Sequence, residues 1–273
     1  MRRRTLLGTA VASAARATLG PRPAGAQADP DAAVDVLLVL AVDVSRSIDA
    51  DEARLQRDGY RNAIAHPRVI EAVRGGVIGA IGLAYVEWSG AEQQRLVHPW
   101  TRIAGMAEAE AWARALNGAP PTSGALDRAP RTSLGQTSIS GAIDFSRRVL
   151  AQAPWRAARR VIDVSGDGVN NSGAPAEEAR DRAVGEGITV NGLAIVNEHP
   201  TYGVARRVPL DEYYRESVIG GPGAFLVLAE AFESFGRAVR RKLIWEISDL
   251  PPPRRTAARV GGGGTRHVED DRE

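Results

Sequence analysis

The feature that most constrains the fold is an alternation of strand-like and helix-like segments along most of the chain. Residues 34–44 are apolar and rich in β-branched side chains, as in a strand buried on both faces of a parallel sheet. Residues 49–65 follow with charges at helical spacing, and Pro67 should close that helix. Chains that repeat this order form a sheet covered by helices. We therefore predict an α/β fold.

Most of the remaining segments fit the same scheme. Residues 76–88 and 94–100 read as strands, and the short Ser89-Gly90 turn between them makes that pair antiparallel. Residues 117–136 are rich in Gly, Pro, Ser and Thr, which predicts a long loop. We expect further helices at 107–116, 138–151, 174–186, 210–218 and 229–247, and further strands at 160–165, 189–195 and 224–228.

The two ends of the chain differ from the middle. Residues 1–28 have a basic start, a short apolar stretch and small residues before Ala28, the layout of an export signal. Arg3 and Arg4, followed by Leu6 and Leu7, resemble the twin-arginine type; the alternative is a short basic tail. Residues 250–273, rich in Pro, Gly and charge, predict a disordered tail. We expect one domain at 29–249, located in the periplasm or secreted.

Composition excludes several functional classes. The leader carries five arginines and no acid, so its removal changes the formal net charge from +2 to −3, and nucleic acid is not an expected partner. No apolar run reaches the roughly 18 residues of a transmembrane helix. The absence of cysteine excludes disulfides, thiolate metal sites and cysteine nucleophiles. The oligomeric state stays open.

Oxygen-bearing side chains gather where the predicted strands end. Asp43, Ser45 and Ser47 follow the first strand, Thr137 precedes a helix, and Asp167 follows the strand 160–165. Ligands of such sheets bind beyond the carboxyl ends of the strands. Carboxylates and hydroxyls suit a hard divalent cation, foremost Mg²⁺, with Mn²⁺ or Ca²⁺ as alternatives. The competing interpretation is that the serines only cap the next helix.

These five residues resemble the metal-ion-dependent adhesion site of the von Willebrand factor A (vWA) domain family. The pattern Asp-x-Ser-x-Ser, then Thr, then Asp is matched in the family's order by Asp43, Ser45, Ser47, Thr137 and Asp167. The resemblance covers residues 34–247 and includes Gly-x-Thr-x-Ile before a helix and Asp-Gly-x-x-Asn after a strand. Residues 212–225 also look like an exported bacterial branch of the clan, catalogued as a domain of unknown function (DUF1194-like).

The resemblance implies a Rossmann-like vWA fold, with a mostly parallel central sheet, one antiparallel edge strand and helices on both faces. It also implies that Ser45, Ser47 and Thr137 bind the ion directly, that Asp43 and Asp167 act largely through water, and that a partner protein supplies an Asp or Glu. Arg46 departs from the family, which more often has glycine there. Near the same edge, Asp163 suits either support of the metal or a structural role as a buried, paired carboxylate.

Enzymatic chemistries find little support. A haloacid dehalogenase-type phosphatase needs a carboxylate where Ser45 stands, and the only lysine, Lys242, is outside any phosphate-loop motif. Ser165 lacks the preceding glycine of a nucleophile turn, and the four histidines have no zinc spacing. The basic residues 237–242 read as the solvated face of the last helix.

The sequence therefore favours an exported, non-enzymatic module that binds an acidic group of a partner through a divalent cation. A metal-assisted hydrolase is one alternative. A structural subunit whose metal only stabilises the fold is the other.

Overall fold

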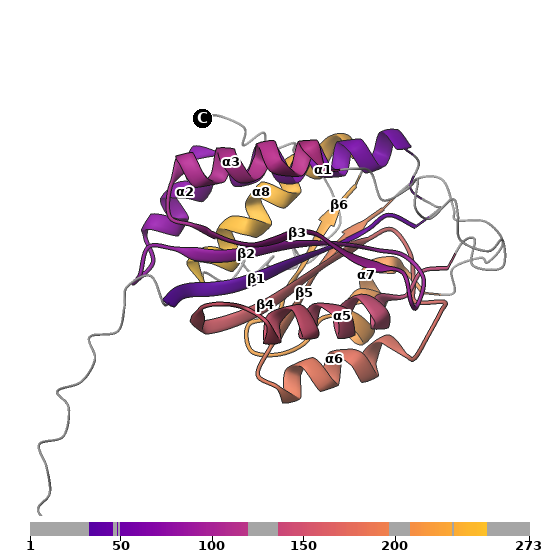
Figure 1. Cartoon of the computed structure of the whole chain (residues 1–273). Coiled ribbons are helices and arrows are strands. Elements are labelled where there is room, and N and C mark those ends of the chain that lie inside the picture. The colour runs from indigo at the N-terminus through magenta and orange to yellow at the C-terminus, as the bar shows by residue number, and fades with distance from the viewer. Residues whose placement is uncertain are drawn as a thin grey trace, which may run out of the picture.

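The fold is a single six-stranded sheet between two layers of helices (Figure 1). The computed structural model describes residues 33–45, 48, 50–119, 136–196, 208–230 and 232–249. The strand order is β3-β2-β1-β4-β5-β6, and only β3 runs antiparallel to its neighbour. The predicted α/β fold with one antiparallel edge strand is thus confirmed. The strands are β1 (Ala33–Asp43), β2 (Ile81–Trp88), β3 (Gln94–Ile103), β4 (Arg156–Gly166), β5 (Thr189–Ile195) and β6 (Leu226–Ala229).

Helices cover both faces of this sheet (Figure 1). One layer contains α1 (Ala50–Ile64), α2 (Pro67–Arg74), α3 (Met106–Gly118) and α8 (Phe232–Ser248). The other contains α5 (Ile139–Ala151), α6 (Ala176–Gly185), α7 (Leu210–Tyr213) and a π-helical turn (Tyr214–Val218). Among the described helices, none has the length and apolarity to cross a membrane.

Strand β1 lies at the centre of the sheet and organises both cores. Its side chains alternate between the layers, with Leu38 and Leu40 packing toward one and Val39 and Ala41 toward the other. It pairs in parallel with β2 on one side and with β4 on the other. The chain therefore leaves β1 at a point where the strand order reverses, the place where sheets of this kind open a crevice.

Several boundaries differ from the sequence prediction. Pro67 does not only close the first helix but begins a second one, α2, which the prediction lacked. Proline is tolerated in the first turn of a helix, and His66 caps α2 by accepting the Arg68 N–H at 3.2 Å. The strand predicted from residue 76 starts at Ile81, because Asp35 accepts the N–H groups of the preceding turn. The predicted leader (1–28), tail (250–273) and most of the loop 117–136 lie outside the described residues.

The prediction of a solvated face at residues 237–242 is wrong for Lys242. This side chain is fully buried, and its Nζ lies 2.8 Å from Asp163 Oδ1 and also pairs with Glu246. Asn191 donates to the same Glu246 at 2.9 Å. Burial, followed by the charge of Glu246, raises the pKa of Asp163 to about 7 even with Lys242 beside it. A buried charged cluster thus links α8 to β4 and β5.

Candidate metal centre

Asp43 and Asp167 meet at the carboxyl ends of two adjacent strands. Asp43 is the last residue of β1, and Asp167 directly follows β4. The two strands are parallel and in register, with Val42 opposite Ser165, so their ends coincide. Both aspartates are buried. The sequence placed them at one edge, and the structure brings them together.

The Asp43 carboxylate is only half satisfied by protein groups. Its Oδ1 accepts the Ser45 N–H at 2.7 Å, while its Oδ2 is buried and has no hydrogen-bond partner among the described residues. Burial, and then the charge of Asp167, raises the pKa of Asp43 well above its usual range, although the Ser45 hydrogen bonds lower it. Two buried carboxylates side by side repel each other. A cation between them would remove both the repulsion and the unpaired oxygen, so these residues fit a metal.

Gly166 allows the groups of this site to approach one another. A Cβ atom at that position would lie 2.9 Å from Asp43 Oδ2 and 3.0 Å from the Tyr214 hydroxyl. Both contacts are shorter than side chains tolerate, so a larger residue would displace the carboxylate. The last residue of β4 is therefore a glycine because Asp43 and Tyr214 converge on its backbone.

Thr137 is fixed beside the Asp167 loop by its backbone. Its N–H donates to Asn171 Oδ1 at 2.7 Å, and its carbonyl accepts the Asn171 N–H at 2.9 Å. The threonine is almost fully buried, and its Oγ1 lies 3.6 Å from the position that a Cβ of Gly168 would take. Asn171 is the asparagine of the Asp-Gly-x-x-Asn motif, so one loop supplies both a carboxylate and the clamp for the hydroxyl.

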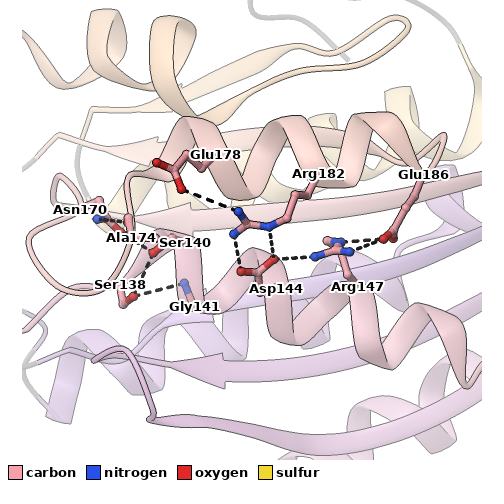
Figure 2. Close-up of polar contacts among 10 residues, drawn as sticks. All are labelled: Ser138, Ser140, Gly141, Asp144, Arg147, Asn170, Ala174, Glu178, Arg182 and Glu186. Carbon is pink, nitrogen blue, oxygen red and sulfur yellow. Dashed lines mark hydrogen bonds and ion pairs between the residues drawn. The ribbon is translucent and has the colours of Figure 1, made fainter.

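A second set of contacts ties the start of α5 to the same loop (Figure 2). Ser138 caps α5 by accepting the Gly141 N–H at 3.2 Å, and Asn170 Oδ1 accepts the Ser140 N–H at 3.1 Å. Farther along, Arg182 Nη2 of α6 donates a hydrogen bond to Asp144 Oδ2 of α5 at 2.7 Å. These bonds connect the segments that carry Thr137 and Asp167, and the site therefore rests on a rigid frame.

Tyr214 is a site residue that the sequence reasoning missed. It is fully buried in the π-helical turn, and its hydroxyl lacks a hydrogen-bond partner within the described part of the chain. Burial, and then the charges of Asp43 and Asp167, raises its pKa well above 10. The hydroxyl therefore lies close enough to both carboxylates to feel their charge. The only signal in the sequence is its place in the segment 212–225 that resembles the exported bacterial branch.

Two other acidic residues near the edge do not join this set. Asp163 points into the opposite layer and pairs with Lys242, so it is a buried structural carboxylate. Glu87 is also buried, and its Oε1 accepts from Arg57 Nε at 2.6 Å. Ser45 lies buried beside Asp43, whereas Ser47 and Arg46 lie outside the described residues. Within those residues no three His, Cys, Asp or Glu side chains form a metal-binding group.

The fold matches that of vWA domains in solved structures. Proximal thread matrix protein 1 from mussel byssus is similar at a TM-score of 0.52 and 16% identity, over 80% of this chain and 49% of that one. A von Willebrand factor type A protein from Catenulispora acidiphila gives 0.51 and 15%, over 78% and 43%. The von Willebrand factor domain of the type V pilus tip protein Mfa5 from Porphyromonas gingivalis gives 0.50 and 10%, over 81% and 97%. This chain thus spans about half the length of the first two proteins or less.

These likenesses define the class as an α/β domain with the vWA fold. A model of the family described as "Protein of unknown function (DUF1194)" matches residues 33–251. The chain therefore belongs to this family, which confirms the resemblance found in the sequence. No curated protein matches the chain. Another structure of the mussel protein is described as having a zinc-occupied MIDAS motif, at a TM-score of 0.52 and 14% identity over 79% of this chain and 46% of that one.

Proposed function

We propose that this chain is an exported, non-enzymatic binding module that recognises an acidic group of a protein partner through a divalent cation. One observation carries the proposal. Two buried carboxylates, Asp43 and Asp167, lie together at the carboxyl edge of the sheet, and Asp43 Oδ2 has no hydrogen-bond partner among the residues that the structure describes. Two buried carboxylates side by side destabilise the free protein, and a bound cation would explain why the protein keeps them.

The residues divide into two roles in this proposal. Asp43 and Asp167 supply negative charge, while the hydroxyls of Ser45, Ser47 and Thr137 supply neutral oxygens; Ser47 belongs to the set from the sequence pattern alone. Mg²⁺ suits such oxygen ligands best, with Mn²⁺ or Ca²⁺ as alternatives. Because few direct ligands would be charged, the bound cation would supply an electrophilic position for an external carboxylate.

The zinc-occupied motif in the mussel protein supports a divalent cation at a site of this type. The pilus proteins among the similar structures support a role in protein contacts outside the cytoplasm. Residues 1–28 as a leader of the twin-arginine type, 29–249 as the domain and 250–273 as a tail remain part of the proposal.

The test is capture of partners from the native cell envelope with immobilised protein, in Mg²⁺ and in excess chelator. We expect partners that are retained in Mg²⁺, released by chelator and lost from Thr137→Ala. Thr189→Ala is the matched control. Thr189 is the first residue of β5, at the amino ends of the parallel strands, and its hydroxyl donates to the Pro222 carbonyl at 3.2 Å. Partners that stay bound in chelator, or that bind both variants equally, would assign the metal a structural role. Metal-dependent turnover in a hydrolase screen would instead indicate an enzyme.

A further inference from the structure

A cavity of about 510 Å³ lies between α2 and α8, away from the candidate metal centre. Helix α2 leads into the first residue of β2, at the amino ends of the parallel strands, whereas Asp43 and Asp167 lie at their carboxyl ends (Figure 1). The cavity is lined by four arginines and two apolar side chains, namely Arg68, Arg237, Arg240, Arg241, Ile244 and Trp245.

The three arginines that α8 contributes to this cavity have no acidic partner in the described part of the chain. Among the described residues, no carboxylate forms an ion pair with Arg237, Arg240 or Arg241. The ionic contacts that α8 makes elsewhere use Lys242, on its buried side. Guanidinium groups remain charged at any pH at which the protein is folded, so neighbouring arginines repel one another and a bound anion would offset that repulsion.

The positive charge of these arginines also affects the pKa of His66, a neighbouring residue. It is partly buried at the start of α2, and its Nδ1 accepts the Arg68 N–H, which requires an unprotonated Nδ1. Burial, and then the charges of Arg240 and Arg68, lowers its pKa from the usual value. The imidazole is therefore held neutral beside the cavity, and its protonation would be sensitive to any anion that enters.

Part of the cavity lining is apolar, because Ile244 and Trp245 contribute to it. Arg241 lies over the Trp245 ring, with 5.5 Å from its guanidinium carbon to the ring centroid, which orients the planar group. Trp245 and Ile244 are both partly buried and form an apolar lining beside the charges. A ligand that carries an anionic head on an organic stem would match both surfaces.

We propose that this cavity binds a phosphate group. A phosphate accepts paired hydrogen bonds from planar guanidinium groups, and its several oxygens can bond to more than one arginine at once. A carboxylate has two oxygens and a single charge, and so matches a cavity lined by several arginines less well. Free phosphate and the head group of an anionic phospholipid share the required chemistry. The site is independent of the proposed metal-dependent function.

The test is calorimetric titration of the purified full chain with inorganic phosphate, together with co-sedimentation on phosphatidylglycerol and phosphatidylcholine vesicles. The test variant is Arg240→Gln with Arg241→Gln. Its matched control is Arg54→Gln with Arg114→Gln, which removes the same charge from exposed helix positions whose ion pairs contribute little. We expect binding to weaken by about tenfold or more in the test variant, on the scale of lost charge-assisted hydrogen bonds, and to stay unchanged in the control.

Two further measurements make the result specific. Arg241→Lys keeps the charge but not the planar fork, and it should still weaken phosphate binding several-fold. In the wild type, bound phosphate should raise the pKa of His66, followed by NMR of its ring protons, because it offsets the neighbouring arginines.

The outcomes separate the sources of the phosphate and the ways in which the proposal fails. Binding of inorganic phosphate indicates a soluble ligand, and binding only to phosphatidylglycerol vesicles indicates a lipid head group. No binding to either, equal binding to phosphatidylcholine, or equal losses in the test and control variants would overturn the proposal. Tighter binding of an oligoglutamate peptide than of phosphate would overturn it as well, in favour of an acidic segment.

Discussion

Replacing Asp43 by asparagine should stabilise the metal-free protein and at the same time abolish its response to Mg²⁺. The substitution removes one of two buried like charges and keeps the oxygen that accepts the Ser45 N–H. The new amide replaces the unpaired Oδ2 with a donor that faces Asp167. Relief of a buried, uncompensated charge is worth about 1 to 2 kcal/mol. For a domain of this size the melting temperature should rise by about 2 to 8 °C.

The wild-type protein should gain stability only when the cation is present. At a free Mg²⁺ concentration of about 100 times the Kd, binding to the native state alone contributes about 2.7 kcal/mol. That corresponds to a rise of about 5 to 11 °C in the melting temperature. Thermal unfolding followed by circular dichroism, in chelator and in Mg²⁺, measures both effects on the same samples.

Asp35→Asn is the control for this experiment. Asp35 lies near the other end of β1 and accepts N–H groups from Ile78 at 2.9 Å and Gly79 at 2.8 Å, so its substitution should lower stability and leave the Mg²⁺ response intact. The reasoning is refuted if Asp43→Asn melts below the wild type in chelator. It is equally refuted if Mg²⁺ still stabilises Asp43→Asn.

Three further predictions concern other parts of the chain. Tyr214→Phe should change the stability of the metal-free protein little, because the hydroxyl has no hydrogen-bond partner in the described part of the chain, but weaken Mg²⁺ affinity about tenfold in calorimetry. Unchanged affinity would remove Tyr214 from the site. Asp163 has a raised pKa of about 7, so wild-type stability should fall between about pH 4 and 7; Lys242→Met should extend that fall and cost about 3 to 5 kcal/mol at pH 8, but less at pH 5, in urea unfolding. A cost independent of pH would contradict this reasoning. Arg3→Lys with Arg4→Lys should retain the protein in the cytoplasm, and envelope protein that begins at Met1 by mass spectrometry would rule out cleavage.

The mostly parallel sheet with one antiparallel edge strand and the meeting of Asp43 with Asp167 could be predicted from local patterns. An apolar run that ends in a carboxylate marks the end of a buried strand, and parallel strands bring such ends together. The neighbourhood of Thr137 and Asp167 followed from the same rule. Whether the five residues bind a metal stays a prediction.

Other features depend on contacts between distant segments, which local patterns do not contain. Helical periodicity shows that Lys242 lies on a charged stretch, but only the packed α8 shows that it turns toward Asp163. Pro67 can follow one helix or begin the next, and the His66 cap decides between them. Tyr214 reaches the carboxylates from a π-helical turn, a geometry with no reliable sequence signature.

The direct pairing of β1 with β4 has a consequence for the time course of folding. The two strands are neighbours in the sheet but are separated in the sequence by β2, β3 and the helices between them. Contacts between such distant segments form slowly, because a long stretch of chain must be ordered before they are made. Asp43 and Asp167 can therefore meet only after β1 and β4 have paired. In refolding, a signal that depends on bound cation should appear later than the signal from helix formation.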